Sequence, residues 1–376
     1  MPTNPISAVD PDGLLEFSVV FTDRSLNHMS QAFQAVMRDM SATLKKVYGA
    51  HSVAIVPGGG TYGMESVARQ LATGKRCTVL RNGWFSYRWT QIFETGSIPS
   101  ASTVLQARRT GTGTTAPFAP APIDEVEAHI RAEKPDLVFA PHVETASGIL
   151  LPNDYLQRVA AAVHAAGGLF VLDCIASGTL WVDMKALGVD VLITAPQKGW
   201  SGTPGAALVM LGERAHERVK ATKSTSFAMD LAKWLSIMET YEGGGHAYHA
   251  TMPTDSLRRL RDLMAETERF GFERARERQI ELGRRVRALL AERGFPSVAA
   301  PGFEAPCVVV SYTTDADLVT KFAKAGAQVA AGVPLQCGEP ADYRAFRIGL
   351  FGLDKLGDVD GTVSRLADKL THATEK

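Results

Sequence analysis

Two polar side chains stand where apolar runs of this sequence end. Asp173 follows the run over residues 168–172, and Lys198 follows the run over 190–194 after Ala-Pro-Gln. A carboxylate that ends a buried strand is costly unless it is paired, so Asp173 should face a cationic group. A lysine just past a buried strand can be partly desolvated, which lowers its pKa and makes its amine a usable nucleophile. Together the acid and the amine suit a cofactor with an aldehyde and a pyridinium nitrogen. Taken alone, each has a simpler interpretation, as a helix cap or a surface lysine.

A glycine-rich turn, Pro-Gly-Gly-Gly-Thr-Tyr-Gly over residues 57–63, follows another apolar run and opens a helical stretch. Glycine allows the backbone to approach a ligand closely, and a helix N-terminus favours a phosphate. Gly58, Gly60 and Gly63 formally match the G-x-G-x-x-G spacing of dinucleotide sites. Such sites need an acidic ribose ligand about twenty residues on, whereas the next apolar run ends in Arg-Asn at 81–82. The turn therefore favours a single phosphate, with a plain strand-to-helix turn as the alternative.

Arg347 stands in the otherwise apolar segment Phe-Arg-Ile-Gly-Leu-Phe-Gly over residues 346–352. An arginine is expensive to bury without an anion, and its guanidinium matches a carboxylate in a two-pronged geometry. The residue is therefore a candidate carboxylate ligand, and a structural ion pair is the competing interpretation.

The elements that must position these residues alternate along the chain. Apolar residues at helical spacing predict a first helix over 26–48. Strands and amphipathic helices then alternate, which predicts an α/β fold with a mostly parallel sheet covered by helices on both faces. In such sheets ligands bind at the carboxyl ends of the strands. The predicted strands are 52–56, 77–80, 136–140, 169–172, 189–194 and 206–210, and predicted helices include 63–71, 123–132 and 155–166.

The pattern changes near residue 250, which predicts a division of the chain. We expect an N-terminal arm (1–25), a large domain (26–254) and a smaller α/β C-terminal domain (255–376). A long charge-rich helix over 269–293 should join the two domains. The C-terminal domain should contain strands 307–311 and 346–350, a helix near 317–325 and a final helix to about 371.

Composition narrows the choice of ligands. The chain has 376 residues, 45% of them hydrophobic and 21% charged, and its 40 Lys and Arg balance 40 Asp and Glu. Without net charge, nucleic acid or an anionic membrane surface is an unexpected partner, and a small molecule is the default ligand. Its four cysteines lack a Cys-x-x-Cys pair, which argues against a zinc site and a disulfide framework. His246 and His249 lie close together in sequence but lack a third ligand, so we expect no metal. We expect a soluble, cytoplasmic protein.

The ordered motifs resemble those of a known family. His-Val-Glu-Thr-Ala-Ser-Gly over 142–148, Asp173 with Ser177, Gln-Lys at 197–198 and Pro-Gly at 204–205 resemble the class V aminotransferases. These are fold-type I enzymes that use pyridoxal 5′-phosphate, and the similarity is greatest to the alanine–glyoxylate and serine–pyruvate aminotransferases. It runs from about residue 50 to the C-terminus. The resemblance implies that the large domain binds the cofactor and that the enzyme is a homodimer with shared active sites.

The resemblance also implies a role for each matching residue. Lys198 would form a Schiff base with the cofactor, and Asp173 would pair with its ring nitrogen; these are the two catalytic candidates. Arg347 would grip the α-carboxylate of the substrate. Tyr248 and Thr251 would reach the cofactor phosphate of a partner subunit. The implied cofactor-binding residues are Gly59, Gly60, Thr61, Phe85, Thr145, Asp173, Ile175, Gln197, Lys198, Tyr248 and Thr251, with Trp84 as the neighbour that could be confused with Phe85.

The implied reaction is transamination between a small amino acid of the alanine or serine type and a small 2-oxo acid, glyoxylate or pyruvate. One alternative is a lyase on the same scaffold, such as a cysteine desulfurase that uses Cys337. Gln197 opposes it, because histidine usually precedes the cofactor lysine in those enzymes. A nicotinamide oxidoreductase built on the glycine turn is a second alternative. The segment over 16–24 lacks the Gly-Pro-Gly-Pro pattern that lines the substrate side in the family, which leaves the substrate open.

Overall fold

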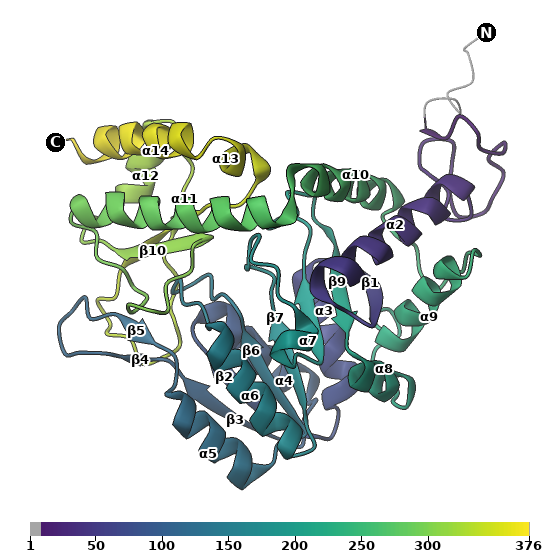
Figure 1. Ribbon diagram of the computed structural model, residues 1–376, viewed down its shortest axis with the longest axis horizontal. Helices are drawn as coiled ribbons and strands as arrows, with labels where there is room; N and C mark the ends of the chain where they lie inside the picture. Colours follow the sequence, from purple (N-terminus) through teal and green to yellow (C-terminus); the bar gives the residue numbers. More distant parts are fainter. Residues whose placement is uncertain (1–8, 376) are drawn as a thin grey trace.

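The computed structural model describes residues 9–375 of the chain. A seven-stranded sheet forms its centre, in the order β1-β9-β8-β7-β6-β2-β3 (Figure 1). The strands from β8 to β3 are mutually parallel, and β9 runs antiparallel to both of its neighbours. The prediction of a mostly parallel sheet is therefore confirmed. The strands are β1 (Ser52–Gly58), β2 (Arg76–Arg81), β3 (Ala101–Gln106), β6 (Leu137–Pro141), β7 (Leu169–Asp173), β8 (Val191–Thr194) and β9 (Gly205–Leu211).

Helices cover both faces of this sheet. Figure 1 shows α5 (Ile123–Glu133) and α6 (Asn153–Ala165) on the near face, and α3 (Gly60–Val67) and α4 (Trp84–Gly96) on the far face. Every residue of β6, β7 and β8 is buried, which explains the unbroken apolar runs. The same double cover leaves only the strand ends open to a ligand. A short π-helical turn, Ala68–Ala72, continues α3.

The first long helix, α2 (Gln31–Tyr48), begins later than the sequence predicted. The hydroxyl of Ser30 accepts a hydrogen bond from Phe33 N (3.1 Å) and so caps the helix. The predicted start at residue 26 is therefore wrong. Met29, which the helical pattern included, lies outside the helix with 40% of its surface exposed.

The helix predicted over 269–293 is confirmed over most of its length, but its start is corrected, because a break at residue 271 divides the chain here into two helices. They are α10 (Thr254–Phe270) and α11 (Phe272–Glu292), separated by Gly271 with φ +98°. Only glycine adopts that conformation without strain. Helix α10 packs on α2 and buries Leu257, Leu260 and Met264 in the core of the large sheet. The predicted domain boundary at residue 255 stays a prediction.

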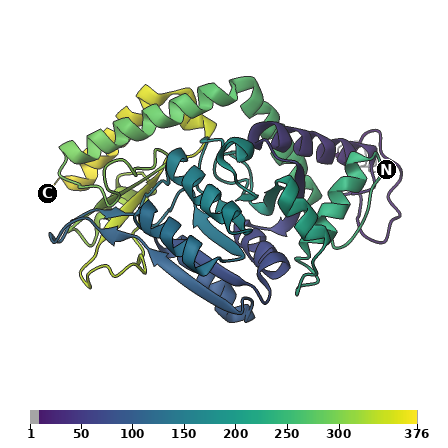
Figure 2. The ribbon, with the colours of Figure 1, turned by 60° about the horizontal axis from the view of Figure 1, so that its bottom comes forward.

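A second, antiparallel sheet lies near the C-terminus, in the order β10-β12-β11. Its strands are β10 (Val308–Tyr312), β11 (Ala330–Ala331) and β12 (Ala345–Gly349). Figure 2 shows α11 and the yellow C-terminal helix α14 (Val359–Thr374) running along one side of this part. The other elements are β4 (Arg108–Arg109), β5 (Phe118–Ala119), α7 (Met184–Leu187), α8 (Glu213–Lys220), α9 (Leu231–Glu242), α12 (Leu318–Lys324) and α13 (Leu353–Gly357).

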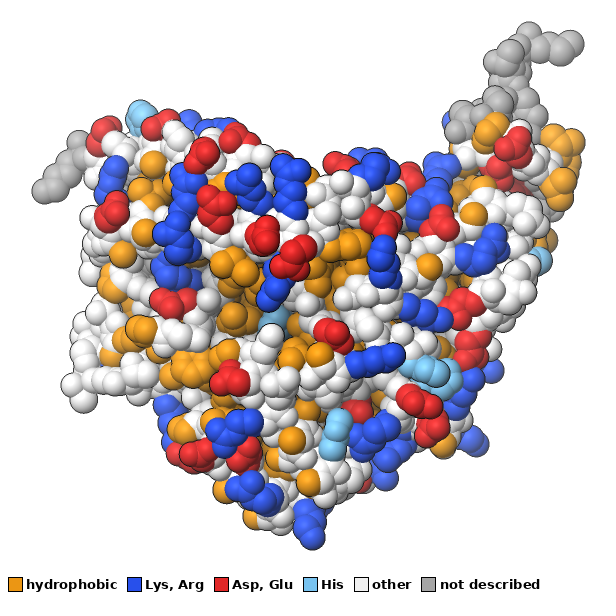
Figure 3. Space-filling view, in the orientation of Figure 1, with side chains coloured by type: hydrophobic (Ala, Val, Ile, Leu, Met, Phe, Trp, Pro, Cys, Tyr) orange, Lys and Arg blue, Asp and Glu red, His pale blue; other side chains and the backbone are white. Residues whose placement is uncertain are grey.

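Acidic and basic side chains intermingle over the face of the molecule seen in Figure 3. This mixture matches the zero net formal charge of the sequence. None of the helices within residues 9–375 is long and apolar enough to cross a membrane.

Candidate active site

A cavity of about 550 Å³ opens at the carboxyl ends of β6, β7 and β8. Most of the predicted site residues meet here, although they come from distant parts of the sequence. Helix α4 and strand β12 contribute to its walls as well. The predicted residues that line it are Gly60, Thr61, Phe85, Thr145, Asp173, Ile175, Gln197, Lys198 and Arg347.

Asp173 is the last residue of β7 and is 7% exposed. Its Oδ1 accepts a hydrogen bond from Ile175 N (2.8 Å), and within residues 9–375 it forms no ion pair. Burial raises the pKa of this carboxyl group to about 7. A protonated ring nitrogen beside it would supply the missing positive charge.

Lys198 follows β8 in the turn that leads to β9. Burial lowers the pKa of its amine, and the positive charge of Arg347 lowers it further. The Nζ atom lies 4.9 Å from the centre of the Phe351 ring. No carboxylate in the described part of the chain pairs with this amine. A desolvated lysine of lowered pKa is suited to attack an aldehyde carbon.

The glycine turn leads from β1 into α3 and is the candidate phosphate cradle. Gly58 has φ +121°, and Gly59 stands just before the first helical residue, with open space beside it. A Cβ atom at Gly60 would lie 2.5 Å from Ile175 Cδ1, so glycine lets that side chain cover the cavity. The first N–H groups of a helix have no partner within it and can bind a phosphate. Gly59 borders the cavity without lining it.

Arg88 adds a cation that the sequence analysis missed. It lines the cavity, and its Nη1 donates a hydrogen bond to Thr61 Oγ1 (2.9 Å). Its guanidinium carbon lies 5.2 Å from the centre of the Phe85 ring. Arg88 follows Phe85 by three residues on α4, and residues at that spacing share one face of a helix. The sequence could therefore have indicated that Arg88 lies beside Phe85.

Phe85 and Arg347 lie against each other in the wall of the cavity. The guanidinium carbon of Arg347 is 5.7 Å from the centre of the Phe85 ring, and its Nε donates to Ala331 O (2.8 Å). Among the residues described, no acid forms an ion pair with Arg347. Trp84 does not line the cavity and stands 5.6 Å from Tyr87, ring centre to ring centre. Of these two neighbours, Phe85 is therefore the aromatic residue that lines the cavity.

Tyr248 and Thr251 are the predicted site residues that lie elsewhere. Both are exposed or partly exposed, and their hydroxyl oxygens are 3.1 Å apart. Neither lines the cavity of its own chain. Their predicted role toward a partner subunit stays a prediction.

Cys337 does not line the cavity either. It is 8% exposed, its Sγ lies 3.5 Å from Arg81 O, and burial raises its pKa to about 12. A cysteine desulfurase needs a mobile, nucleophilic thiolate near the substrate. The thiol of Cys337 is buried, and its raised pKa disfavours the thiolate, so it does not fit that role. No group of three metal-ligating residues occurs in the chain over residues 9–375.

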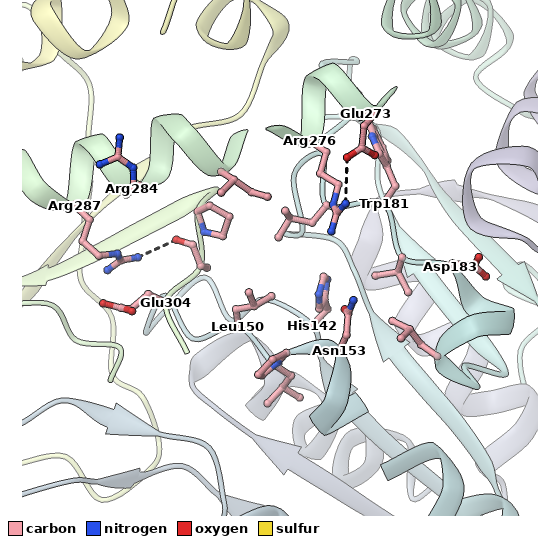
Figure 4. A pocket seen from close by; sticks show the side chains of 18 of the residues that line it. His142, Leu150, Asn153, Trp181, Asp183, Glu273, Arg276, Arg284, Arg287 and Glu304 are labelled. Carbon is pink, nitrogen blue, oxygen red and sulfur yellow. Dashed lines mark hydrogen bonds and ion pairs between the residues drawn. The ribbon is translucent and has the colours of Figure 1, made fainter. Parts of the chain in front are cut away.

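A second cavity of about 1020 Å³ lies between α11 and the starts of α6 and α7. Figure 4 shows His142 at its floor and Arg276 paired with Glu273 (3.3 Å) on its wall. His142 is buried, and its Nδ1 lies 2.8 Å from Ser177 Oγ. None of the predicted catalytic residues and no lysine lines this cavity. The smaller cavity is therefore the candidate active site.

Comparison with known proteins identifies the family. Residues 16–346 match the family model described as "Aminotransferase class-V". The chain belongs to the class V aminotransferases. Pyridoxal phosphate is accordingly the cofactor of this aminotransferase, which excludes the nicotinamide alternative. The buried acid, the desolvated amine and the glycine cradle fit its ring nitrogen, its aldehyde and its phosphate.

Several named relatives resemble this aminotransferase. It is 25% identical over 362 residues to the alanine–glyoxylate aminotransferase of Rattus norvegicus, covering 93% of this chain and 83% of that protein. A match of 28% identity to the rabbit (Oryctolagus cuniculus) enzyme spans 263 residues, 67% of this chain and 65% of the relative. The 2-aminoethylphosphonate–pyruvate transaminase 2 of Paraburkholderia xenovorans is 27% identical, with 85% of this chain and 84% of that protein covered.

Solved structures show the same fold. The crystal structure of an alanine–glyoxylate aminotransferase from Nostoc superposes with a TM-score of 0.77 at 19% identity, covering 93% of this chain and 89% of the other. Fold-type I architecture is thus confirmed for this aminotransferase.

Proposed function

We propose that this aminotransferase moves the amino group of a small amino acid, of the alanine or serine type, to a small 2-oxo acid such as glyoxylate or pyruvate. The observation that carries the proposal is Arg347 in the cavity wall. Within residues 9–375 its guanidinium has no acidic partner at ion-pair distance, and burial lowers its pKa. A substrate carboxylate would satisfy it. The names of the rat and rabbit relatives support the choice of substrates.

Three side chains would divide the work of the reaction. Pyridoxal phosphate, when bound, supplies an electron-accepting ring conjugated to the substrate nitrogen. Asp173 would hold the proton on the ring nitrogen. Arg347 would fix the carboxylate so that the Cα–H bond stands perpendicular to the ring. The amine of Lys198 would then take the proton from the substrate Cα and deliver it to the aldehyde carbon of the cofactor.

The walls of the cavity would hold the cofactor in place. Phe85 would cover one face of the ring and Ile175 the other, while Thr145 would bind the ring hydroxyl. Gly59, Gly60, Thr61 and Gln197 would hold the phosphate. All of them except Gly59 line the cavity.

A half-reaction screen tests the choice of substrate. Each amino acid is added to the holoenzyme, and the visible absorbance of the bound cofactor is followed in the absence of an oxo acid. We expect alanine or serine to convert the cofactor and 2-aminoethylphosphonate, which has no α-carboxylate, to be inert. Conversion by the phosphonate but by no α-amino acid would overturn the proposal and leave the family assignment in place.

We also propose a homodimer in which Tyr248 and Thr251 of one subunit serve the cofactor of the other. Both residues are exposed and neither lines the cavity of its own chain, which supports this. The test mixes inactive Lys198→Ala with the double variant Tyr248→Phe/Thr251→Ala and lets subunits exchange. Mixed dimers contain one site with native residues from both chains, so activity should exceed the sum of the two variants. A strictly additive mixture contradicts the shared site.

A further inference from the structure

We propose that Glu144 is a positioning residue that holds the two walls of the cofactor slot, Phe85 and Thr145, at a fixed separation. The proposal rests on the roles proposed above for those two residues. Glu144 is 0% exposed, and within the described part of the chain no cation forms an ion pair with it. It does not line the cavity, so it acts through its neighbours.

The carboxylate of Glu144 accepts four hydrogen bonds. Oε1 accepts from Phe85 N (3.2 Å) and from Ala146 N (2.9 Å). Oε2 accepts from Ser86 N (2.9 Å) and from Ser86 Oγ (2.7 Å). An ionised carboxylate offers four lone-pair positions and no donor. All of its hydrogen-bonding capacity is therefore used by two segments, the start of α4 and the loop after β6.

The reason for an acid at this position lies in α4. The residue before this helix is Gly83, which has no side chain to cap the first N–H groups. Glu144 reaches across from the neighbouring loop and caps them instead, and a negative charge at a helix N-terminus is favourable. A Cβ atom at Gly83 would lie 2.7 Å from Glu144 Cγ, so only glycine leaves room for the carboxylate.

The same contacts fix both walls. Phe85 provides one of the bound N–H groups, and Thr145 lies between Glu144 and Ala146, whose N–H closes the loop onto the carboxylate. Phe85 in turn supports Arg347, whose guanidinium carbon lies 5.7 Å from the ring centre. The negative charge of Glu144 also opposes the lowering of the Arg347 pKa by burial. The carboxylate of Glu144 thus connects three parts of the proposed site. They are Phe85, the loop that carries Thr145, and Arg347.

The test replaces Glu144 by Gln in the full-length enzyme. The amide keeps the shape but presents an NH2 group to the N–H donors of α4, which leaves buried donors unsatisfied. We expect the dissociation constant of pyridoxal phosphate to rise about tenfold or more. The visible circular dichroism of the bound cofactor should weaken, because its ring is less firmly held. The KM for the amino acid should rise more than kcat falls, because Arg347 is displaced.

Asp190→Asn is the matched control. Asp190 is also buried (4% exposed) and also accepts a backbone hydrogen bond, from Phe170 N (2.7 Å), but it lies at the opposite end of the sheet. This variant should lose thermal stability and keep the wild-type cofactor affinity and dichroism. If Glu144→Gln also keeps the wild-type cofactor affinity and dichroism, Glu144 is merely structural. The same conclusion follows if both variants lose cofactor affinity and dichroism in proportion to their loss of thermal stability.

Two further variants keep the test decisive if Glu144→Gln folds poorly. Ser86→Ala removes a hydroxyl that donates to Glu144 and accepts from Asn82 N (2.9 Å) and Gly83 N (3.2 Å). It leaves the backbone donors to Glu144, so its loss of dichroism should be smaller than that of Glu144→Gln. Glu144→Asp keeps the charge but shortens the reach, so it should retain one of the two segments and give an intermediate dichroism. Wild-type values for both would overturn the proposal. Because cofactor binding needs no substrate, this result is independent of the substrate screen.

Discussion

Two buried aspartates at opposite ends of the central sheet have very different surroundings. Asp190, just before β8, accepts from Phe170 N, and its carboxylate pairs with His164 (2.9 Å) and Arg214 (3.2 Å). Asp173, at the end of β7, accepts one hydrogen bond, from Ile175 N, and has no ion pair within residues 9–375. The protein satisfies the first acid itself and leaves the second for a ligand.

The same contrast extends to the basic residues. On the surface, Arg158 pairs with Asp124 (2.5 Å) and Glu127 (2.8 Å). In the cavity, Lys198, Arg88 and Arg347 have no acidic partner among the described residues. Partly burying a charge without a partner costs free energy, and a ligand of opposite charge would recover some of it. A cluster of such groups at one end of a sheet therefore marks a site whose ligand carries the complementary charges.

Lys198→Ala gives the largest expected effect. Without the amine there is no nucleophile for the aldehyde and no base for the Cα proton, so the transamination rate should fall by about 1,000-fold or more. Borohydride treatment followed by mass spectrometry should find cofactor attached to the wild type at Lys198 and none on the variant. The surface change Lys75→Ala should leave both readouts unchanged. Attachment at another lysine would contradict the assignment.

Asp173→Asn should lower kcat by about 100-fold, because an amide does not stabilise the proton on the ring nitrogen. Single-turnover kinetics would measure the loss in the proton-transfer step. Asp190→Asn, which changes the satisfied aspartate, should leave that step untouched. Equal kinetic losses in the two variants would contradict the proposed difference in role between Asp173 and Asp190.

Ionising the buried carboxyl group of Asp173 should cost stability, so the stability of the cofactor-free protein should depend on pH. Its folded pKa of about 7 lies above the ordinary 3.8, so the folded state binds more protons than the unfolded state between these values. The free energy of unfolding should therefore fall as pH rises from 4 to 7, by at most about 4 kcal/mol. Asp173→Asn should lack this loss and be the more stable protein at pH 8. Urea unfolding across this pH range measures it, and parallel curves for the two proteins would contradict the raised pKa.

Arg347→Lys should raise the KM for the amino acid by about 10-fold to 100-fold, since a point charge replaces a two-pronged contact. The cofactor dissociation constant should change little, because the proposed role of Arg347 is to bind the substrate carboxylate and not the cofactor. Steady-state kinetics with alanine, together with a cofactor titration, separate the two effects. A variant that loses cofactor rather than substrate affinity would place Arg347 in the phosphate cradle instead.

The fold was most predictable where burial is complete. Strand β7 was expected over 169–172 and spans Leu169–Asp173, because a strand buried on both faces is apolar throughout. Strand β3 was missed because it lies at the sheet edge, where all six of its residues are exposed or partly exposed and no buried apolar run marks it. The helix errors at Ser30 and Gly271 came from overlooking a cap and a positive-φ break, both of which are visible in the sequence.

The site was predictable where strand ends alone bring residues together. Asp173 and Lys198 meet because parallel neighbours end at the same edge. Glu144 was not predictable in this way, because its role depends on contacts with Ser86, which is 58 residues earlier in the sequence. For Tyr248 and Thr251 the sequence predicts a role that a single chain does not test, because that role needs a second copy of the chain.

Arg88→Gln gives the smallest expected effect. It tests whether an arginine without an acidic partner at the cavity end of the sheet contributes to cofactor binding. Its guanidinium contacts Thr61 at the phosphate cradle and lies over Phe85, so its loss should weaken cofactor binding by about threefold to tenfold. The effect should shrink at high salt, because a partly exposed charge is screened. Arg76→Gln, at the opposite end of the sheet, is the matched control and should leave binding unchanged. Arg88→Gln could instead bind the cofactor as tightly as the wild type at low salt. The guanidinium would then serve only to pack against Phe85, and its lack of an acidic partner would not indicate a contact with the cofactor.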